Sequence, residues 1–180
     1  MKRNWHKAAR ALSSLAKDYG RVVDAAERGG ARRPRVSALG DASVWALGGM
    51  RVATALRAVT GSSFGLNHAL RIVFHIDAWS DDIGGGLRLP HPFGIVIGEG
   101  ARIEEGCTLM HNVTLQRGRG THIERGAVIG TGAVILGGSR VGEQALVGAN
   151  SVVRGEIPAR MVAVGAPARA VRAATHEELS

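Results

Sequence analysis

Aliphatic side chains recur at every sixth position through the second half of this 180-residue chain, and this period constrains the fold more than any other feature. The positions form two series, one before and one after a break at Arg119: Ile83, Leu89, Ile95, Ala101, Cys107, Val113; Ile123, Ile129, Ile135, Val141, Val147, Val153, Ala159. We place an insertion of four residues within 116–122, where the period restarts. A six-residue period fits neither an α-helix nor an alternating hairpin, and it is typical of a β-helix.

Each six-residue unit is expected to form one short strand and one turn, with its aliphatic side chain inside a narrow core. Three units complete one coil, so residues 83–159 predict about four coils. Aromatic residues make up only 4% of the chain and Gly contributes 26 residues, as expected for a thin core with frequent tight turns. Because Cys107 occupies one of the core positions, we interpret it as a packing residue rather than a nucleophile.

The first part of the chain lacks this period and predicts helices instead. Apolar residues at helical spacing indicate a helix over 4–27 that Gly20 could interrupt, followed by a Gly- and Pro-rich connector over 28–40. A second helix over about 42–59 has Asp41 as its N-cap, and a third, short helix covers 65–75. The predicted fold is mainly β: an α-helical N-terminal region (1–80), a β-helix domain (81–171) and a C-terminal tail (172–180).

Charge and composition narrow the classes of function. The excess of 23 Lys and Arg over 15 Asp and Glu gives a net charge of +8, which attracts anionic partners. No nucleic-acid-binding signature accompanies the Arg-rich segment 28–35, so we interpret it as a solvated linker and expect no nucleic-acid partner. No apolar run is long enough for a transmembrane helix or a secretory signal, and a single Cys is compatible with a reducing cytoplasm.

Several stretches of the predicted β-helix resemble the serine O-acetyltransferases, a family of hexapeptide-repeat acyltransferases. These stretches are LPHPFGIVIGEGARIEEG (89–106), VTL (113–115), IGTGAVILGG (129–138) and VGANSVVRGEIPARMVAVGAPARAV (147–171). The resemblance implies a left-handed parallel β-helix that forms a homotrimer, with acetyl-CoA bound between neighbouring subunits. It also implies transfer of an acetyl group from acetyl-CoA to L-serine, a cytoplasmic step of cysteine biosynthesis. In bacterial members the helical region joins two trimers, so a dimer of trimers is also open here.

The resemblance assigns the catalytic residues. The family's general base matches His91, which is expected on the outside of the coil and would take the proton of the acceptor hydroxyl as that oxygen attacks the thioester. Glu99 matches an acidic position near the acceptor pocket. The family pairs its base with an Asp fifteen residues earlier; this position is Ile76 here, so the neighbouring Asp77 is our candidate for orienting the imidazole.

The substrate and cofactor contacts also follow from the resemblance. The Arg-His pair that holds the serine carboxylate falls in the inserted loop, where Arg119 matches the Arg and Gly120 replaces the His. His122, two residues further on, is the candidate substitute, and Pro90 stands where the family has an Asp. Guanidinium groups suit the nucleotide phosphates of the co-substrate. The candidate acetyl-CoA contacts are His111, Thr131, Gly132, Ala149, Arg154 and Arg169.

These departures from the family pattern leave alternatives open. The acceptor could be another hydroxyl or amine, such as homoserine, a sugar or a natural-product intermediate. The chain could also be a non-catalytic β-helix assembly protein, because a fold does not guarantee an activity. Trimeric β-helix enzymes resembling γ-class carbonic anhydrases bind zinc through three His, but the spacing of His91, His111 and His122 differs, so we predict no metal.

Overall fold

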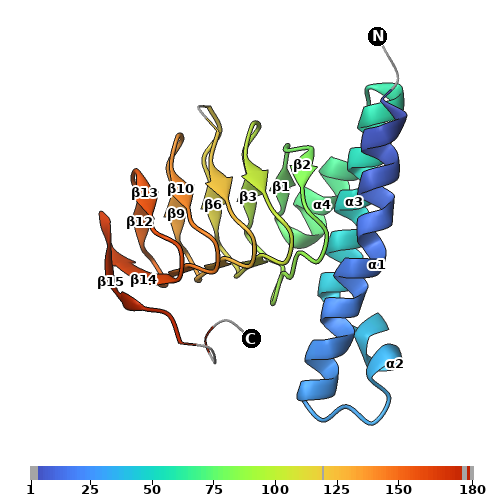
Figure 1. Ribbon diagram of the computed structural model, residues 1–180. Coiled ribbons are helices and arrows are strands. Elements are labelled where there is room, and N and C mark those ends of the chain that lie inside the picture. The colour runs from blue at the N-terminus through green and yellow to red at the C-terminus, as the bar shows by residue number, and fades with distance from the viewer. Residues whose placement is uncertain (1–3, 119, 176–177, 179–180) are drawn as a thin grey trace.

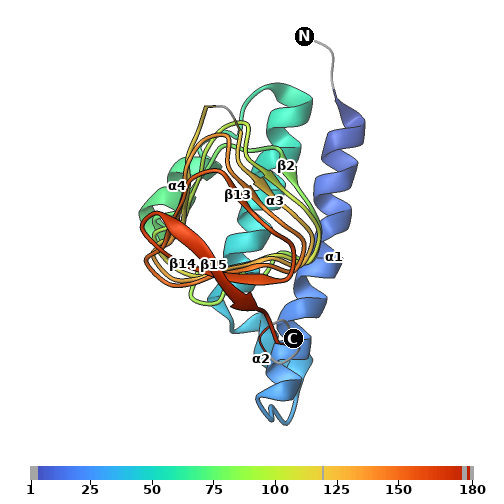
Figure 2. The same ribbon diagram turned by 60° about the vertical axis from the view of Figure 1, so that its left-hand side comes forward.

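The computed structural model describes residues 4–118, 120–175 and 178. It consists of a group of helices packed against one end of a parallel β-helix (Figure 1). The helix α1 runs across this end of the stack of coils, and a C-terminal hairpin lies at the opposite end (Figure 1). Seen from a second direction, the coils overlie one another in a rounded outline with α1 beside them (Figure 2).

The helical part contains α1 (Trp5–Arg28), α2 (Pro34–Leu39), α3 (Ala42–Thr60) and α4 (Leu66–Phe74). The helix α1 continues through Gly20 without a break, and the predicted connector contains α2. The start of α3 is as predicted, because the side chain of Asp41 accepts a hydrogen bond from the Ser43 amide at 2.7 Å. It ends at Gly61, whose φ of 80° is left-handed. In the described part of the chain, no helix is long and apolar enough to cross a membrane.

Short strands stack into three sheets along the β-helix. Sheet A contains β1 (Asp77–Ala78), β3 (Val96–Ile97), β6 (Thr114–Leu115), β9 (Val134–Ile135) and β12 (Val152–Val153). Sheet B contains β2 (Asp82–Ile83), β4 (Arg102–Ile103), β7 (His122–Ile123), β10 (Arg140–Val141) and β13 (Glu156–Ile157). Sheet C contains β5 (Thr108–Leu109), β8 (Val128–Ile129), β11 (Leu146–Val147), β14 (Met161–Gly165) and β15 (Ala168–Ala173). All pairs are parallel except the antiparallel hairpin β14–β15. The described residues thus form about five coils rather than the predicted four.

The strand register corrects the predicted insertion. Ile103 pairs with Ile123, twenty positions on, whereas Ile123 pairs with Val141, eighteen positions on. The extra length near 116–122 is therefore two residues and not four. The error has a simple cause, because each unit points two side chains inward, as Val113 and Leu115 do. The predicted series followed the second of these positions at Ile83 and Leu89, the first from Ile95 to Val113, and the second again after the loop.

The buried positions agree with the predicted periodicity except at its end. The predicted core positions from Ile83 to Val153 are all buried. Ala159 is exposed, so its placement in the core was wrong. Only four positions separate Val153 from the next buried residue, Ile157, so the final unit is short and the period ends there. Cys107 is fully buried, and this burial raises the pKa of its thiol to about 11, which agrees with a packing role.

A buried ion pair joins the helices to the first coil. The Arg51 Nε of α3 lies 2.8 Å from the Asp18 Oδ2 of α1. The Arg51 guanidinium also donates to the carbonyl of Ile83 at 2.6 Å, and Asp18 accepts from the Leu87 amide at 3.0 Å. Because both side chains are almost completely buried, the hydrogen bonds to the coil are needed to offset their desolvation. This pair fixes α1 and α3 against the coil that carries His91.

Candidate active site

One edge of the β-helix collects the candidate base and several candidate cofactor contacts. It is the edge where sheet C passes into sheet A, and its corners are residues 90–94, 110–112, 130–132 and 148–150; we call it the His91 edge. Backbone hydrogen bonds stack these corners: Asn112 N donates to Phe93 O, Gly132 N to His111 O and Asn150 N to Thr131 O. The structure thus brings together the following predicted residues: His91, His111, Thr131, Gly132, Ala149.

His91 projects from a widened corner of the first coil. Eight positions separate Arg88 from Val96, while six separate their partners Thr108 and Thr114. The two additional residues widen the segment that holds His91, whose side chain is exposed. Its φ of 57° is left-handed, which is uncommon for a residue other than Gly. Unusual backbone of this kind gathers at functional sites, and here it holds the imidazole outside the coil, as expected.

His111 lies beside His91 on the next coil. The two ring centroids are 6.1 Å apart, with the rings edge to face. The Nδ1 atom of His111 is buried and has no hydrogen-bond partner among the described residues. A buried polar atom without a partner costs free energy, so this nitrogen is available to a bound molecule or a water.

The structure does not bring Asp77 to His91. Asp77 lies at the start of sheet A, where its carboxylate accepts a hydrogen bond from the Trp79 indole at 2.8 Å. It also lies 3.8 Å from the Arg71 guanidinium. Ile76, at the position of the family's Asp, is buried in the core. In the described residues, no hydrogen bond or ion pair joins a carboxylate to His91, so the orienting role of Asp77 stays a prediction.

Two further predicted residues lie on a different edge, where sheet A passes into sheet B. Glu99 is exposed there, and its carboxylate lies 3.0 Å from the Arg117 guanidinium. Arg154 follows β12 on this same edge. Arg119, the predicted acceptor contact, lies outside the described residues. The sequence alone did not show that these side chains and His91 occupy separate edges of one protomer.

The last two predicted residues lie away from both edges. His122 is in strand β7 of sheet B, and its Nε2 lies 2.8 Å from Glu104 Oε1. This hydrogen bond lowers the pKa of the Glu104 carboxyl. Arg169 is in β15 at the far end of the stack, where its guanidinium donates to the Ala168 carbonyl. Within the ranges that the structure describes, no three His, Cys, Asp or Glu side chains gather closely enough to hold a metal ion.

A cleft of about 350 Å³ lies beside His91, on the side that faces the helices. Arg88 and Pro90 of the first coil line it together with Asp41 and Ser43 at the start of α3. Arg88 was not predicted as a site residue from the sequence, and Asp41 was predicted only as a helix cap. The weak signal for Arg88 was a cation three residues before the candidate base.

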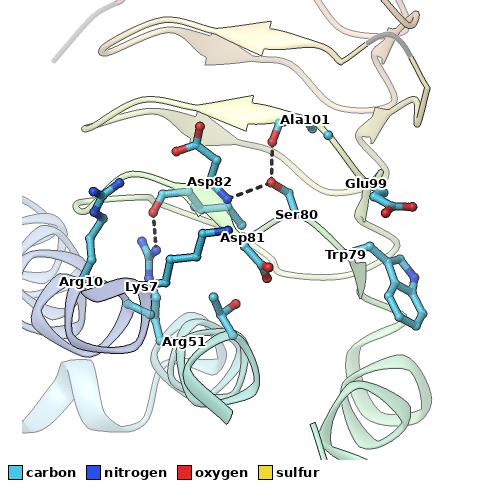
Figure 3. Close-up of a pocket in the computed structure, with 13 residues that line it drawn as sticks. Lys7, Arg10, Arg51, Trp79, Ser80, Asp81, Asp82, Glu99 and Ala101 are labelled. Carbon is cyan, nitrogen blue, oxygen red and sulfur yellow. Dashed lines mark hydrogen bonds between the residues drawn. The ribbon is translucent and has the colours of Figure 1, made fainter. Parts of the chain in front are cut away.

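A second cleft, of about 460 Å³, opens between α1, α3 and the first coil (Figure 3). The hydroxyl of Ser80 donates to the Ala101 carbonyl and accepts from the Asp82 amide, and carboxylates of the coil face basic side chains of the helices (Figure 3). Of the predicted site residues that the structure describes, Glu99 alone lines this cleft. The cleft beside His91 is therefore the better candidate for the reaction.

Comparisons with known proteins agree with this fold. Residues 120–155 match the family of bacterial transferase hexapeptides (six repeats). Together with the stacked parallel coils, this match defines the class of hexapeptide-repeat transferases.

The serine acetyltransferase of Escherichia coli K12 is 40% identical over 113 residues, which are 59% of this chain and 41% of that protein. The structure of the Neisseria gonorrhoeae serine acetyltransferase aligns with a TM-score of 0.81 and 26% identity over 93% of this chain and 68% of that one. The soybean apoenzyme aligns with a TM-score of 0.75 and 34% identity over 88% and 69%. The chain belongs to the serine acetyltransferase family, and its β-helix is left-handed, as the resemblance implied. It spans 35% of the length of the curated relatives from Schizosaccharomyces pombe and Buchnera aphidicola.

Proposed function

We propose that this chain is an acetyl-CoA-dependent O-acetyltransferase that converts L-serine and acetyl-CoA into O-acetylserine and CoA. The observation on which the proposal rests is the placement of His91. Its side chain is exposed on a widened corner of the first coil, with the other corners of the His91 edge on one side and a cleft of about 350 Å³ on the other. Two similar structures support the choice of substrates: a serine acetyltransferase in complex with CoA (29% identity, TM-score 0.77) and the soybean enzyme in complex with serine (30%, 0.75).

The chemistry needs one proton acceptor and two substrates bound together. In the proposed reaction the His91 imidazole removes the proton of the acceptor hydroxyl while that oxygen attacks the thioester carbonyl. The tetrahedral intermediate then collapses, the C–S bond breaks, and the CoA sulfur leaves with the proton that the imidazolium returns. Direct transfer is favoured because Cys107, the single thiol of the chain, is buried in the core and cannot act as a nucleophile.

The pantetheine arm of acetyl-CoA is proposed to lie along the His91 edge, past His111, Thr131, Gly132 and Ala149. The unpartnered Nδ1 of His111 supports this path, because a polar group of the arm would satisfy it. Glu99 and Arg154 belong to the other edge, so they reach this groove only if a neighbouring protomer presents that edge. We therefore propose a homotrimer with acetyl-CoA bound between subunits. The proposed reaction would be a step of cysteine biosynthesis in the cytoplasm. A dimer of trimers through the helices would be compatible with it.

A specific observation favours a second candidate, acetyl transfer to a different hydroxyl or amine. Ile76 fills the core at the position of the family's orienting Asp, and Gly120 replaces the His of the acceptor pair. Homoserine and amino sugars are the acceptors to compare with L-serine.

The test is CoA release from acetyl-CoA, followed with a thiol-reactive chromogen, in the presence of each acceptor. Replacing His91 by Ala is expected to lower kcat/KM for L-serine by about 10²- to 10⁴-fold, the usual contribution of a general base. The matched control is His68→Ala, because His68 is exposed on α4 and has no proposed role. CoA release that does not depend on the acceptor and is unchanged in His91→Ala would refute the proposal. CoA binding without transfer to any acceptor would instead indicate a non-catalytic assembly protein.

A further inference from the structure

The corner that carries His91 has an unusual backbone shape that needs support from its surroundings. The φ of His91 is 57°, whereas a residue that precedes proline, as His91 precedes Pro92, favours extended backbone. The Phe93 amide donates to the His91 carbonyl at 2.8 Å, and this bond closes a three-residue turn around the buried Pro92. Backbone of this kind costs free energy and persists only where neighbouring contacts fix it.

The end of α4 takes the place of a preceding coil at this corner. Along the His91 edge, each corner donates a backbone hydrogen bond to the corner of the coil before it, as Asn112 does to Phe93. The corresponding donor of the first coil is the Gly94 amide, which bonds instead to the carbonyl of Phe74, the last residue of α4, at 3.2 Å. The strand register agrees, because β1 and β3 pair with an offset of nineteen positions, the same as separates Phe74 from Phe93.

Phe93 is held at three points. Its amide donates to the His91 carbonyl, and its carbonyl accepts from the Asn112 amide at 2.9 Å. Its ring lies against the Phe74 ring, with the centroids 6.0 Å apart and the planes tilted by 43°, within the range of distances that aromatic pairs favour. Phe74 in turn packs against the continuous core of the β-helix. A series of contacts thus runs from this core through the two rings to the backbone of His91.

We propose that Phe93 is a positioning residue for the general base: its contact with Phe74 fixes the corner and thereby the direction of the His91 imidazole. The inference rests on the proposed function and adds to it a residue that acts through His91. The Phe93 ring is 46% exposed, so it contributes less to the core than a buried Phe would, and its removal should leave the fold intact. A displacement of about 1 Å at a reacting group can cost about 10²-fold in rate, so turnover should depend on this contact more than substrate binding does.

The experiment is steady-state acetyl transfer to L-serine by the full chain, comparing wild type with Phe93→Leu, which keeps an apolar side chain but removes the ring. The kcat is expected to fall about ten- to hundredfold, while the KM values for L-serine and acetyl-CoA stay unchanged. Phe93→Tyr keeps the ring and should retain most of the wild-type kcat. The matched control is Phe64→Leu, because Phe64 is 71% exposed in the turn before α4 and has no proposed role.

A double-mutant cycle tests whether the two rings act together. Phe74→Leu is expected to lower kcat as well, because it removes the other half of the contact. Phe74→Leu combined with Phe93→Leu should lower kcat little more than the stronger of the two single variants, since only one contact is lost. Effects that simply multiply would show that the rings act independently, and the inference would then be wrong.

An NMR signal of the imidazole separates this inference from the proposed function. In protein labelled with ¹³C at His Cε1, the His91 signal is identified by its loss in His91→Ala. Wild type, Phe93→Tyr and Phe64→Leu should each show one sharp signal, and Phe93→Leu a broadened or divided one, because the ring exchanges among orientations. A sharp signal or an unchanged kcat in Phe93→Leu overturns the inference and leaves the acetyltransferase, and so does equal broadening in Phe64→Leu. If no acceptor is acetylated, the proposed function fails, and the NMR signal alone decides whether Phe93 positions His91.

Discussion

The two regions of this molecule bury their apolar side chains in different ways. In the β-helix the inward positions of successive coils form one continuous cluster, and many members are fully buried. At its helical end this cluster also includes Ala46, Leu47 and Met50 of α3 and Leu70 of α4. The helices form two further, small clusters: Ala8, Ala11 and Ala55 in one, and Val22, Val23 and Ala38 in the other. Large apolar side chains of the helices stay exposed, among them Trp5 at 61% and Trp45 at 64%. The core of the β-helix thus continues into α3 and α4, whereas the parts of the helices away from the coils bury only small apolar clusters.

The candidate site lies where these two regions meet. The repeated coils provide the His91 edge, and any coil of the stack could in principle present such an edge. The cleft beside His91 exists only at the first coil, because α1 and the start of α3 close it there. In the proposed reaction the repeat would give His91 a rigid support, whereas selection of the acceptor would depend on the less extensively packed helices.

The largest expected effect concerns the buried ion pair of the helices, Asp18 with Arg51, which also hydrogen-bonds to the first coil. Replacing Arg51 by Ala leaves Asp18 charged and buried, and such a loss typically costs about 3–5 kcal/mol of unfolding free energy. The helices are expected to lose hydrogen-exchange protection, while the coils beyond the first retain it. Urea unfolding combined with exchange measured by mass spectrometry would show both effects.

The control for this variant removes both charges. Asp18→Leu combined with Arg51→Met is expected to recover most of the lost stability, because no unpaired buried charge remains. If Arg51→Ala instead lowers the protection of all coils equally, the two regions unfold as one unit and the comparison fails.

The second test removes buried volume from the β-helix. Ile135 is fully buried in a central coil, so Ile135→Ala is expected to cost about 2–5 kcal/mol through lost burial and a cavity. Val52→Ala on the outer face of α3, where the side chain is 39% exposed, should change the free energy by about 0.5 kcal/mol or less. Thermal and urea unfolding of both variants provide the measurement. A large effect of Val52→Ala would mean that the helical face is more tightly packed than its exposure indicates.

How much the sequence could predict depended on whether a feature was local. The core positions of the coils were predictable because each six-residue unit repeats the same local geometry. The size of the insertion was not, since Val113 and Leu115 are both aliphatic and both point inward. The cleft beside His91 was also out of reach, because Asp41 and Arg88 approach each other only through the packing of α3 on the first coil. The Trp79 partner of Asp77 is local, only two residues further along the chain, yet the sequence pattern did not indicate this hydrogen bond.

The smallest test concerns hydrogen-bonded pairs of polar side chains on the outer face of the coils, in contrast with the buried ion pair of the helices. Glu104 and His122 form such a pair, each with a side chain about 30% exposed. Their hydrogen bond holds the pKa of Glu104 below its usual value, which is near 4.3 in an unfolded chain. The carboxylate therefore stabilises the fold above about pH 4.3, and this contribution is lost as the pH falls through the folded pKa. Glu104→Gln should cost about 1 kcal/mol or less at pH 7 and nothing at lower pH, measured by urea unfolding across this range. A cost at pH 7 similar to that of Arg51→Ala would contradict a β-helix stabilised mainly by its interior.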